Sequence, residues 1–211
     1  MPANIPPSTA ATPAAAFERL LNIMDTLREQ CPWDKKQTLE TLRHLTIEET
    51  YELSDAILEG NPQEIKKELG DIMLHLVFYA RIASETQAFN ITDVLNTICE
   101  KLIHRHPHIY GETEVQTEED VKRNWEQLKL REGNKSVLEG VPASLPALIK
   151  ASRIQEKARG VGFDWEEKSQ VWEKVEEEMN EFRNEFNVDD DSLIDKEQAE
   201  NEFGDLLFSL I

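Results

Sequence analysis

Residues 38–82 read TLETLRHLTIEETYELSDAILEGNPQEIKKELGDIMLHLVFYARI, and this stretch decides the fold. Apolar side chains recur along it at spacings of three and four, which is the period of a helix packed on one side. Thr38 can cap the start of a first helix, and Gly60 can end it. Asn61 and Pro62 then form the cap and first-turn pair that starts a second helix. The stretch therefore predicts an antiparallel helical hairpin.

Acidic residues interrupt the apolar stripe of each predicted helix. Glu52 lies eight residues before Gly60 and Glu68 eight after it, while Glu49 and Asp71 each lie eleven residues from it. In an antiparallel hairpin these pairs come level, so we expect four carboxylates to converge in one cleft, with Glu48 adjacent. The stripes are Leu42, Leu45, Glu49, Glu52 and Ala56 on the first helix, and Glu68, Asp71, His75, Phe78 and Ile82 on the second.

Four converging carboxylates need a positive charge nearby to offset their mutual repulsion. Charge repulsion and loss of hydration would together cost several kcal/mol per ion in a half-buried place. A hard divalent cation supplies the missing charge, and ligation by oxygen alone favours Mg²⁺ or Mn²⁺ over zinc or copper. The alternative is a set of ordinary solvent-facing helix acids, which are common in acidic proteins.

The acid pattern occurs twice. Residues 48–52, EETYE, correspond to residues 177–181, EEMNE, at an offset of 129. Residues 68–71, ELGD, correspond to residues 202–205, EFGD, at an offset of 134. The five-residue difference falls in the turn between the paired helices. Two copies of one helical unit explain this better than chance, and they argue against the surface-acid alternative.

Helical periodicity also dominates the rest of the chain from residue 17 onward. Residues 1–16, rich in Pro and Ala, predict a disordered tail, and the Gly, Pro, Asn and Ser of residues 133–146 indicate a linker. We therefore predict an all-α protein with two tandem domains, 17–132 and 147–211, in four-helix-bundle-type packing. Further helices are expected at 17–29, from 92 to before Pro107, from Thr117 to 132, at 147–159, at 167–186 and after the acidic run 189–191, with a loop at 107–116.

The composition narrows the function classes. The 211 residues carry 42 acidic and 23 basic side chains, a net charge of −19. Such a surface repels nucleic-acid phosphates, so we do not expect a polymer of that kind as partner. Cys31 and Cys99 form no disulfide framework, which favours a reducing cytoplasm, and no apolar run is long enough to span a membrane.

The acid motif resembles the MazG family of the all-α nucleotide pyrophosphohydrolase superfamily. Glu-Glu-x-x-Glu, fifteen residues and then Glu-x-x-Asp is that family's pattern. The similarity covers about residues 17–211. It includes CPWDKKQT at 31–38, RHPH at 105–108, WEQ at 125–127, LPAL at 145–148 and GFDW at 162–165.

The resemblance assigns roles to individual residues. Lys101 and Arg105 match basic positions that face the triphosphate, although Cys99 and Glu100 stand where the family often has Asn beside that lysine. Glu48 resembles an acid of the first cluster, and Glu48 or Glu49 would be the catalytic base. Metal ligands would be Glu49, Glu52, Glu68 and Asp71 in the first domain, and Glu178, Glu181, Glu202 and Asp205 in the second, where Glu177 parallels Glu48.

The second domain departs from the pattern. The chain ends six residues after Asp205, whereas 34 residues separate Asp71 from Arg105 in the first domain. We expect a truncated second domain that lacks the phosphate-facing basic helix. Activity in this chain is then expected from the first domain.

Some residues keep two interpretations. Trp33 could stack on a nucleobase or anchor its loop in the core. His75 follows Asp71 by four residues and could orient it, or could be a packed core histidine. Pro107 prevents His104, His106 and His108 from sharing one helix face, so we do not expect a zinc site there.

The resemblance implies Mg²⁺-dependent hydrolysis of nucleoside triphosphates to monophosphate and pyrophosphate, with Mn²⁺ as a substitute, in nucleotide-pool house-cleaning. One alternative is a catalytically weak module that senses nucleotides or binds a partner, and another is a plain helical scaffold. A second apolar row lies beside the acid stripe, and family members pair such units, so we expect a homodimer. The row is Ile65, Leu69, Ile72, Leu76 and Tyr79.

Overall fold

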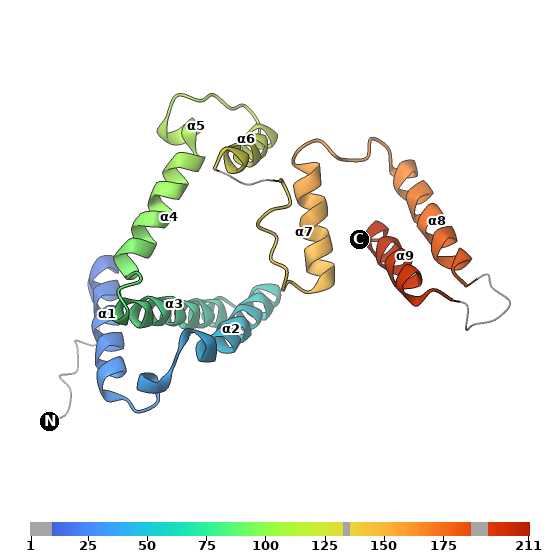
Figure 1. The fold of residues 1–211 in the computed structure, drawn as a ribbon. Coiled ribbons are helices and arrows are strands. Elements are labelled where there is room, and N and C mark those ends of the chain that lie inside the picture. The colour runs from blue at the N-terminus through green and yellow to red at the C-terminus, as the bar shows by residue number, and fades with distance from the viewer. Residues whose placement is uncertain (1–9, 133–135, 187–193) are drawn as a thin grey trace. The chain divides into compact units, whose positions relative to one another are not determined.

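The computed structural model describes residues 10–132, 136–186 and 194–211. Every regular element in these ranges is a helix, which confirms the predicted all-α class (Figure 1). The chain divides into an N-terminal compact unit, Met1–His104, and a C-terminal compact unit, Arg105–Ile211. This boundary, between residues 104 and 105, lies before residue 132, where the sequence predicted that the first domain ends. The domain bounds and bundle packing inferred from the repeat stay a prediction.

The N-terminal compact unit is built on three long helices. The first begins at Pro13, not at residue 17, because Thr12 caps it by accepting a hydrogen bond from the Ala15 amide at 3.2 Å. The predicted tail is therefore wrong for residues 13–16, and residues 1–9 lie outside the described ranges. The elements are α1 (Pro13–Gln30), η1 (Asp34–Lys36), α2 (Leu39–Glu59), α3 (Pro62–Glu85) and α4 (Ile91–Arg105), which ends at the boundary.

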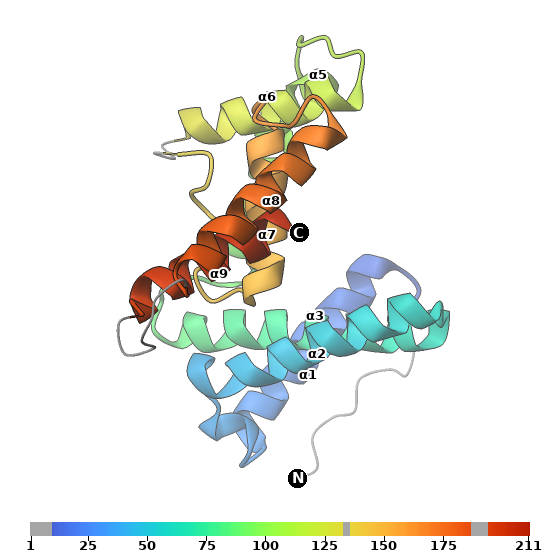
Figure 2. The ribbon, with the colours of Figure 1, turned by 90° about the vertical axis from the view of Figure 1, so that its right-hand side faces the viewer.

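The predicted hairpin is confirmed, and its ends are capped as the sequence indicates. Thr38 and Thr41 exchange side-chain to backbone hydrogen bonds of 3.2 and 2.8 Å at the start of α2. Gly60 ends α2 with a φ of 64°, a left-handed conformation that favours glycine. The Asn61 side chain then caps α3. As a result, α2 and α3 lie side by side in both ribbon views (Figures 1 and 2).

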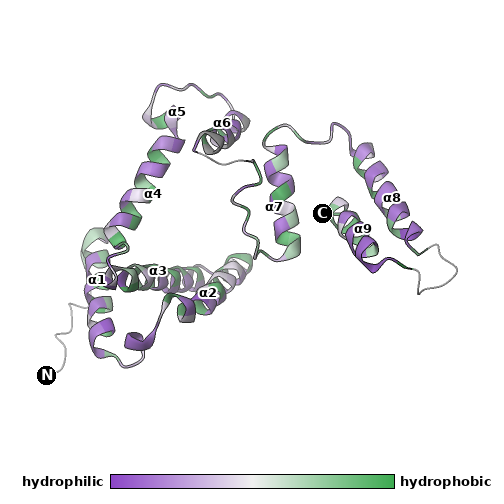
Figure 3. Ribbon diagram, viewed as in Figure 1, coloured by the Kyte–Doolittle hydropathy of each residue, from purple (hydrophilic) through white to green (hydrophobic). Residues whose placement is uncertain are grey.

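The core of this unit lies where α1 packs against the hairpin. Met24, Leu42, Val77 and Phe78 are each at most 2% exposed. Polar and apolar residues alternate along both helices of the hairpin (Figure 3), as expected for helices that are packed on one side. Across the described ranges, no helix combines the length and apolar character that a membrane crossing needs.

The C-terminal compact unit repeats the hairpin with α8 and α9, which pack against each other. A short helix forms at Pro107, where we expected a loop, because proline suits the first turn of a helix. Thr117 and Asp120 exchange hydrogen bonds of 3.2 and 3.1 Å and so form a capping pair at the start of the helix expected from Thr117. The acidic run 189–191 lies outside the described residues. The helices are α5 (Pro107–Tyr110), α6 (Glu118–Arg131), α7 (Ala147–Arg159), α8 (Lys168–Asn184) and α9 (Lys196–Ser209).

Leu42 tests the position of the core. It is 0% exposed on α2, whereas Leu58 on the same helix is 82% exposed. We expect Leu42→Ala to lower the free energy of unfolding by about 2–5 kcal/mol, because it leaves a cavity. Leu58→Ala should cost less than about 1 kcal/mol. Urea unfolding of both variants measures the difference, and equal losses would place the core elsewhere.

Candidate metal centre

Three acidic residues of the hairpin converge. Glu49 on α2 and Glu68 and Asp71 on α3 each offer a carboxylate oxygen within 4.8 Å of the others. We call these three residues the first acid cluster. The level arrangement expected from the spacing about Gly60 accounts for the meeting, because Glu49 and Asp71 lie at equal distances from that turn.

The other acids of the predicted set stand at the edge of this cluster. Glu52 is exposed, and its Oε2 lies 4.0 Å from the Lys67 Nζ. The same Nζ lies 2.8 Å from Glu68 Oε1. Glu48 is exposed and its charge acts on Glu49. Glu52 is thus joined to the first acid cluster through a lysine, which the sequence analysis did not single out.

The electrostatics of the cluster show a deficit of positive charge. Burial raises the pKa of Glu49 above its ordinary value, and the nearby charges of Asp71 and Glu52 raise it further. Glu68 is only 3% exposed, and its Oε2 is buried without a hydrogen-bond partner. A buried, unpartnered carboxylate oxygen is costly in a protein. A divalent cation among these oxygens would fit both observations.

A buried polar group lies one helical turn beyond Asp71. His75 is 7% exposed, and its Nδ1 lies 3.1 Å from the Thr46 Oγ1. The same hydroxyl lies 2.5 Å from the Tyr79 hydroxyl. Burial lowers the pKa of His75, while the charge of Asp71 opposes that shift. His75 is therefore a packed, hydrogen-bonded histidine, as the core interpretation expects, and a role in orienting Asp71 stays a prediction.

The second hairpin gathers its own acids. Glu178, Glu181 and Glu202 offer oxygens within 4.8 Å of one another, and we call them the second acid cluster. Burial raises the pKa of Glu181, and the charges of Glu178 and Glu202 raise it further. Asp205 is not among these three, but with Glu178 it lines a cavity of about 880 Å³ beside the loop that carries Trp165.

The predicted substrate-binding residues occupy different places. Lys101 is exposed on α4, in the N-terminal compact unit. Arg105 belongs to the C-terminal compact unit, where its Nη2 lies 2.5 Å from the Glu132 Oε2. Trp33 is 54% exposed in the loop before α2, so the core-anchor interpretation is wrong. Contact of these residues with a triphosphate stays a prediction.

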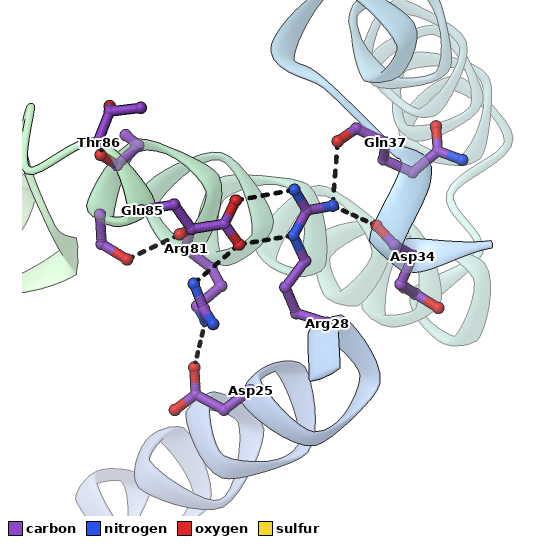
Figure 4. Close-up of polar contacts among 9 residues, drawn as sticks. Asp25, Arg28, Asp34, Gln37, Arg81, Glu85 and Thr86 are labelled. Carbon is purple, nitrogen blue, oxygen red and sulfur yellow. Dashed lines mark hydrogen bonds and ion pairs between the residues drawn. The ribbon is translucent and has the colours of Figure 1, made fainter. Parts of the chain in front are cut away.

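Arg28 holds the loop that carries Trp33 (Figure 4). Its Nε and Nη2 donate to the two oxygens of Glu85 at 2.7 and 2.9 Å. Its Nη1 donates to the carbonyl oxygens of Asp34 and Gln37, which fixes both ends of η1. Sequence reasoning missed this residue, because Arg28 and Glu85 are 57 positions apart and no local pattern connects them.

The fold and site together define an all-α protein whose two helical hairpins each gather a carboxylate cluster. The profile of the MazG nucleotide pyrophosphohydrolase domain matches residues 37–110. A Thermotoga maritima protein named nucleoside triphosphate pyrophosphohydrolase/pyrophosphatase MazG is 45% identical over 200 residues, which is 92% of this chain and 74% of that one. The Escherichia coli nucleoside triphosphate pyrophosphohydrolase is 40% identical over 202 residues, 92% of this chain and 76% of that one.

The chain belongs to the MazG family. A crystal structure of a mazG-related protein from Thermotoga maritima is also similar, with 26% identity and a TM-score of 0.48. That match covers 54% of this chain and 98% of the other.

The Arg28–Glu85 pair makes stability depend on pH. The hydrogen bond from Arg28 lowers the pKa of Glu85, and the charges of Arg28 and Arg81 add to it. A carboxylate with a depressed pKa stabilises the fold above its ordinary pKa, and this stabilisation is lost as pH falls through the folded-state pKa. We expect Glu85→Gln to have a lower melting temperature than the parent at pH 7. This difference in melting temperature, which we call the gap, should close as the pH falls.

Thermal scans from pH 7 down to pH 3 measure this gap. Glu29→Gln is the matched control, because Glu29 is an exposed acid on α1. A gap for Glu85→Gln that is unchanged across the scan would contradict the ion pair.

Proposed function

We propose that this chain hydrolyses nucleoside triphosphates to nucleoside monophosphates and pyrophosphate in a Mg²⁺-dependent reaction. The observation that carries the proposal is the first acid cluster, in which a buried Glu68 oxygen lacks a partner beside two further carboxylates. Family membership supports the reaction class, since the relatives in two organisms are named nucleoside triphosphate pyrophosphohydrolases.

Glu49, Glu68 and Asp71 would hold Mg²⁺, with Glu52 completing the set when Lys67 releases it. Carboxylate oxygens are the ligands that this ion prefers, and Mn²⁺ can replace it in such sites. When bound, the ion would offset phosphate charge and lower the pKa of the attacking water. Glu178, Glu181, Glu202 and Asp205 would form the corresponding set in the second hairpin.

The protein's own residues would then move the proton and orient the substrate. A Glu49 oxygen that the ion leaves free would accept the proton from the attacking water. Glu48 is the second choice for this base, because it is exposed beside the cluster. Lys101 and Arg105 would offset the negative charge on the phosphates. Trp33, exposed on a loop fixed by Arg28, would stack on the base.

Glu68→Gln tests the reaction and the site together. It removes one buried charge and keeps the shape, so we expect release of pyrophosphate from a panel of nucleoside triphosphates with Mg²⁺ to fall on the order of 100-fold or more. Glu64→Gln is the matched control, because Glu64 is exposed one turn earlier on α3. Nucleotide binding without pyrophosphate release by the unaltered chain would favour the nucleotide-sensing alternative.

We also propose that the chain works as a homodimer in a reducing cytoplasm. Leu69 and Leu76 of the second apolar row are 52% and 49% exposed on α3. Surface patches of this kind mark association sites. Cys31 and Cys99 are free, which suits a reducing compartment. The charge of −19 supports a small substrate over a nucleic-acid polymer.

Light scattering at micromolar concentration tests the dimer. We expect twice the 24.3 kDa chain mass. Leu69→Lys and Leu76→Lys together should shift the mass toward one chain, because they place charge in the proposed interface. A single-chain mass for the unaltered protein would overturn this proposal without touching the reaction.

A further inference from the structure

A lysine pairs with the most buried carboxylate of each acid cluster. In the first, the Lys67 Nζ lies 2.8 Å from Glu68 Oε1, and Glu68 is 3% exposed. In the second, the Lys174 Nζ lies 2.6 Å from Glu178 Oε1, and Glu178 is 6% exposed. Each hairpin thus supplies one ammonium group to the most buried acid of its cluster.

The two lysines do not occupy equivalent positions in the repeat. Lys67 belongs to α3, and the offset of 134 places Asn201 at its equivalent. Lys174 belongs to α8, and the offset of 129 places Leu45 at its equivalent. The paired acids are not equivalent either, because Glu178 corresponds to Glu49 and Glu68 corresponds to Glu202. Each hairpin therefore reaches its lysine pair at a different place, and in both the partner is the most buried acid of the cluster.

A cation bound at the first acid cluster would be repelled by the ammonium group of Lys67 in its present position. Its Nζ occupies one oxygen of Glu68, the residue whose other oxygen lacks a partner. An ammonium group a few ångströms from a divalent ion repels it, and the first acid cluster is too small to separate the two. The Lys67 side chain is 59% exposed, so it can turn away into water.

We propose that Lys67 is the counter-ion of the metal-free first acid cluster, and that it makes this cluster prefer a divalent cation bound to a triphosphate over the free cation. Free Mg²⁺ must displace Lys67 without compensation. A triphosphate brings its own negative charge, to which the released ammonium group can turn. Lys67 is then a specificity-determining residue, and this role rests on the proposed function.

Lys67→Met and Lys66→Met separate this role from a general change of charge. Both remove one positive charge from neighbouring positions of α3, but the Lys66 Nζ donates to the Gln63 side chain at 2.8 Å. Both are made in Glu181→Gln protein, so that the second acid cluster contributes less to the signal. Melting temperatures are recorded during a Mg²⁺ titration without nucleotide.

We expect Lys67→Met to melt lower than Lys66→Met without metal. It should then reach half of its Mg²⁺-induced rise at a concentration on the order of ten-fold lower, because the competing charge is gone. Lys67→Arg should restore the parent's Mg²⁺ requirement. If Lys67→Met needs as much Mg²⁺ as Lys66→Met, or more, the counter-ion role is wrong.

Binding of a non-hydrolysable triphosphate analogue with Mg²⁺, followed by calorimetry, tests the second half of the proposal. We expect Lys67→Met to bind it on the order of ten-fold more weakly than Lys66→Met, the opposite direction to free Mg²⁺. If the two variants bind the analogue with equal affinity, the proposal that Lys67 turns toward the phosphates is wrong. If the parent binds the analogue but releases no pyrophosphate from triphosphates, the proposed function fails while these comparisons still decide the role of Lys67.

Discussion

Repulsion among carboxylates that the hairpin forces together is the constraint on which this structure depends. A helical hairpin with acids on its inner stripes cannot close without bringing Glu49, Glu68 and Asp71 within 4.8 Å. The caps at Thr38 and Asn61 and the turn at Gly60 fix the register that makes them meet. The packed core of Met24, Leu42 and Phe78 holds the hairpin closed against that repulsion.

The sequence predicted the parts of the fold that are set by local chemistry. Caps and helix periods depend on neighbouring residues, so the hairpin was placed to within a residue or two. The start of α1 was missed, because an Ala- and Pro-rich stretch resembles a tail until Thr12 is recognised as a cap. Pro107 was seen as the end of one helix, and its ability to begin another was overlooked.

The residues of the candidate site also fall into two groups, those that local sequence patterns predict and those that only the folded structure reveals. The convergence of Glu49, Glu68 and Asp71 follows from helix period and turn symmetry, so it could be predicted. Contacts made by long side chains across the fold could not. Arg28 reaches Glu85 and the carbonyl oxygens of Asp34 and Gln37. Lys67 reaches Glu52 and Glu68, and neither set of contacts leaves a periodic trace in the sequence.

The two hairpins also differ in the length of chain that joins their acids. Five more residues separate the two motifs in the second copy, yet each copy gathers three carboxylates within 4.8 Å of one another, although the three are not the equivalent ones. The paired helices therefore bring acids together despite the different interval between the motifs. A motif search for distant relatives should therefore keep the three-residue spacing inside each acid pair rigid and leave the interval between the pairs variable. Insertions at that turn are the changes such proteins can accept as they diverge.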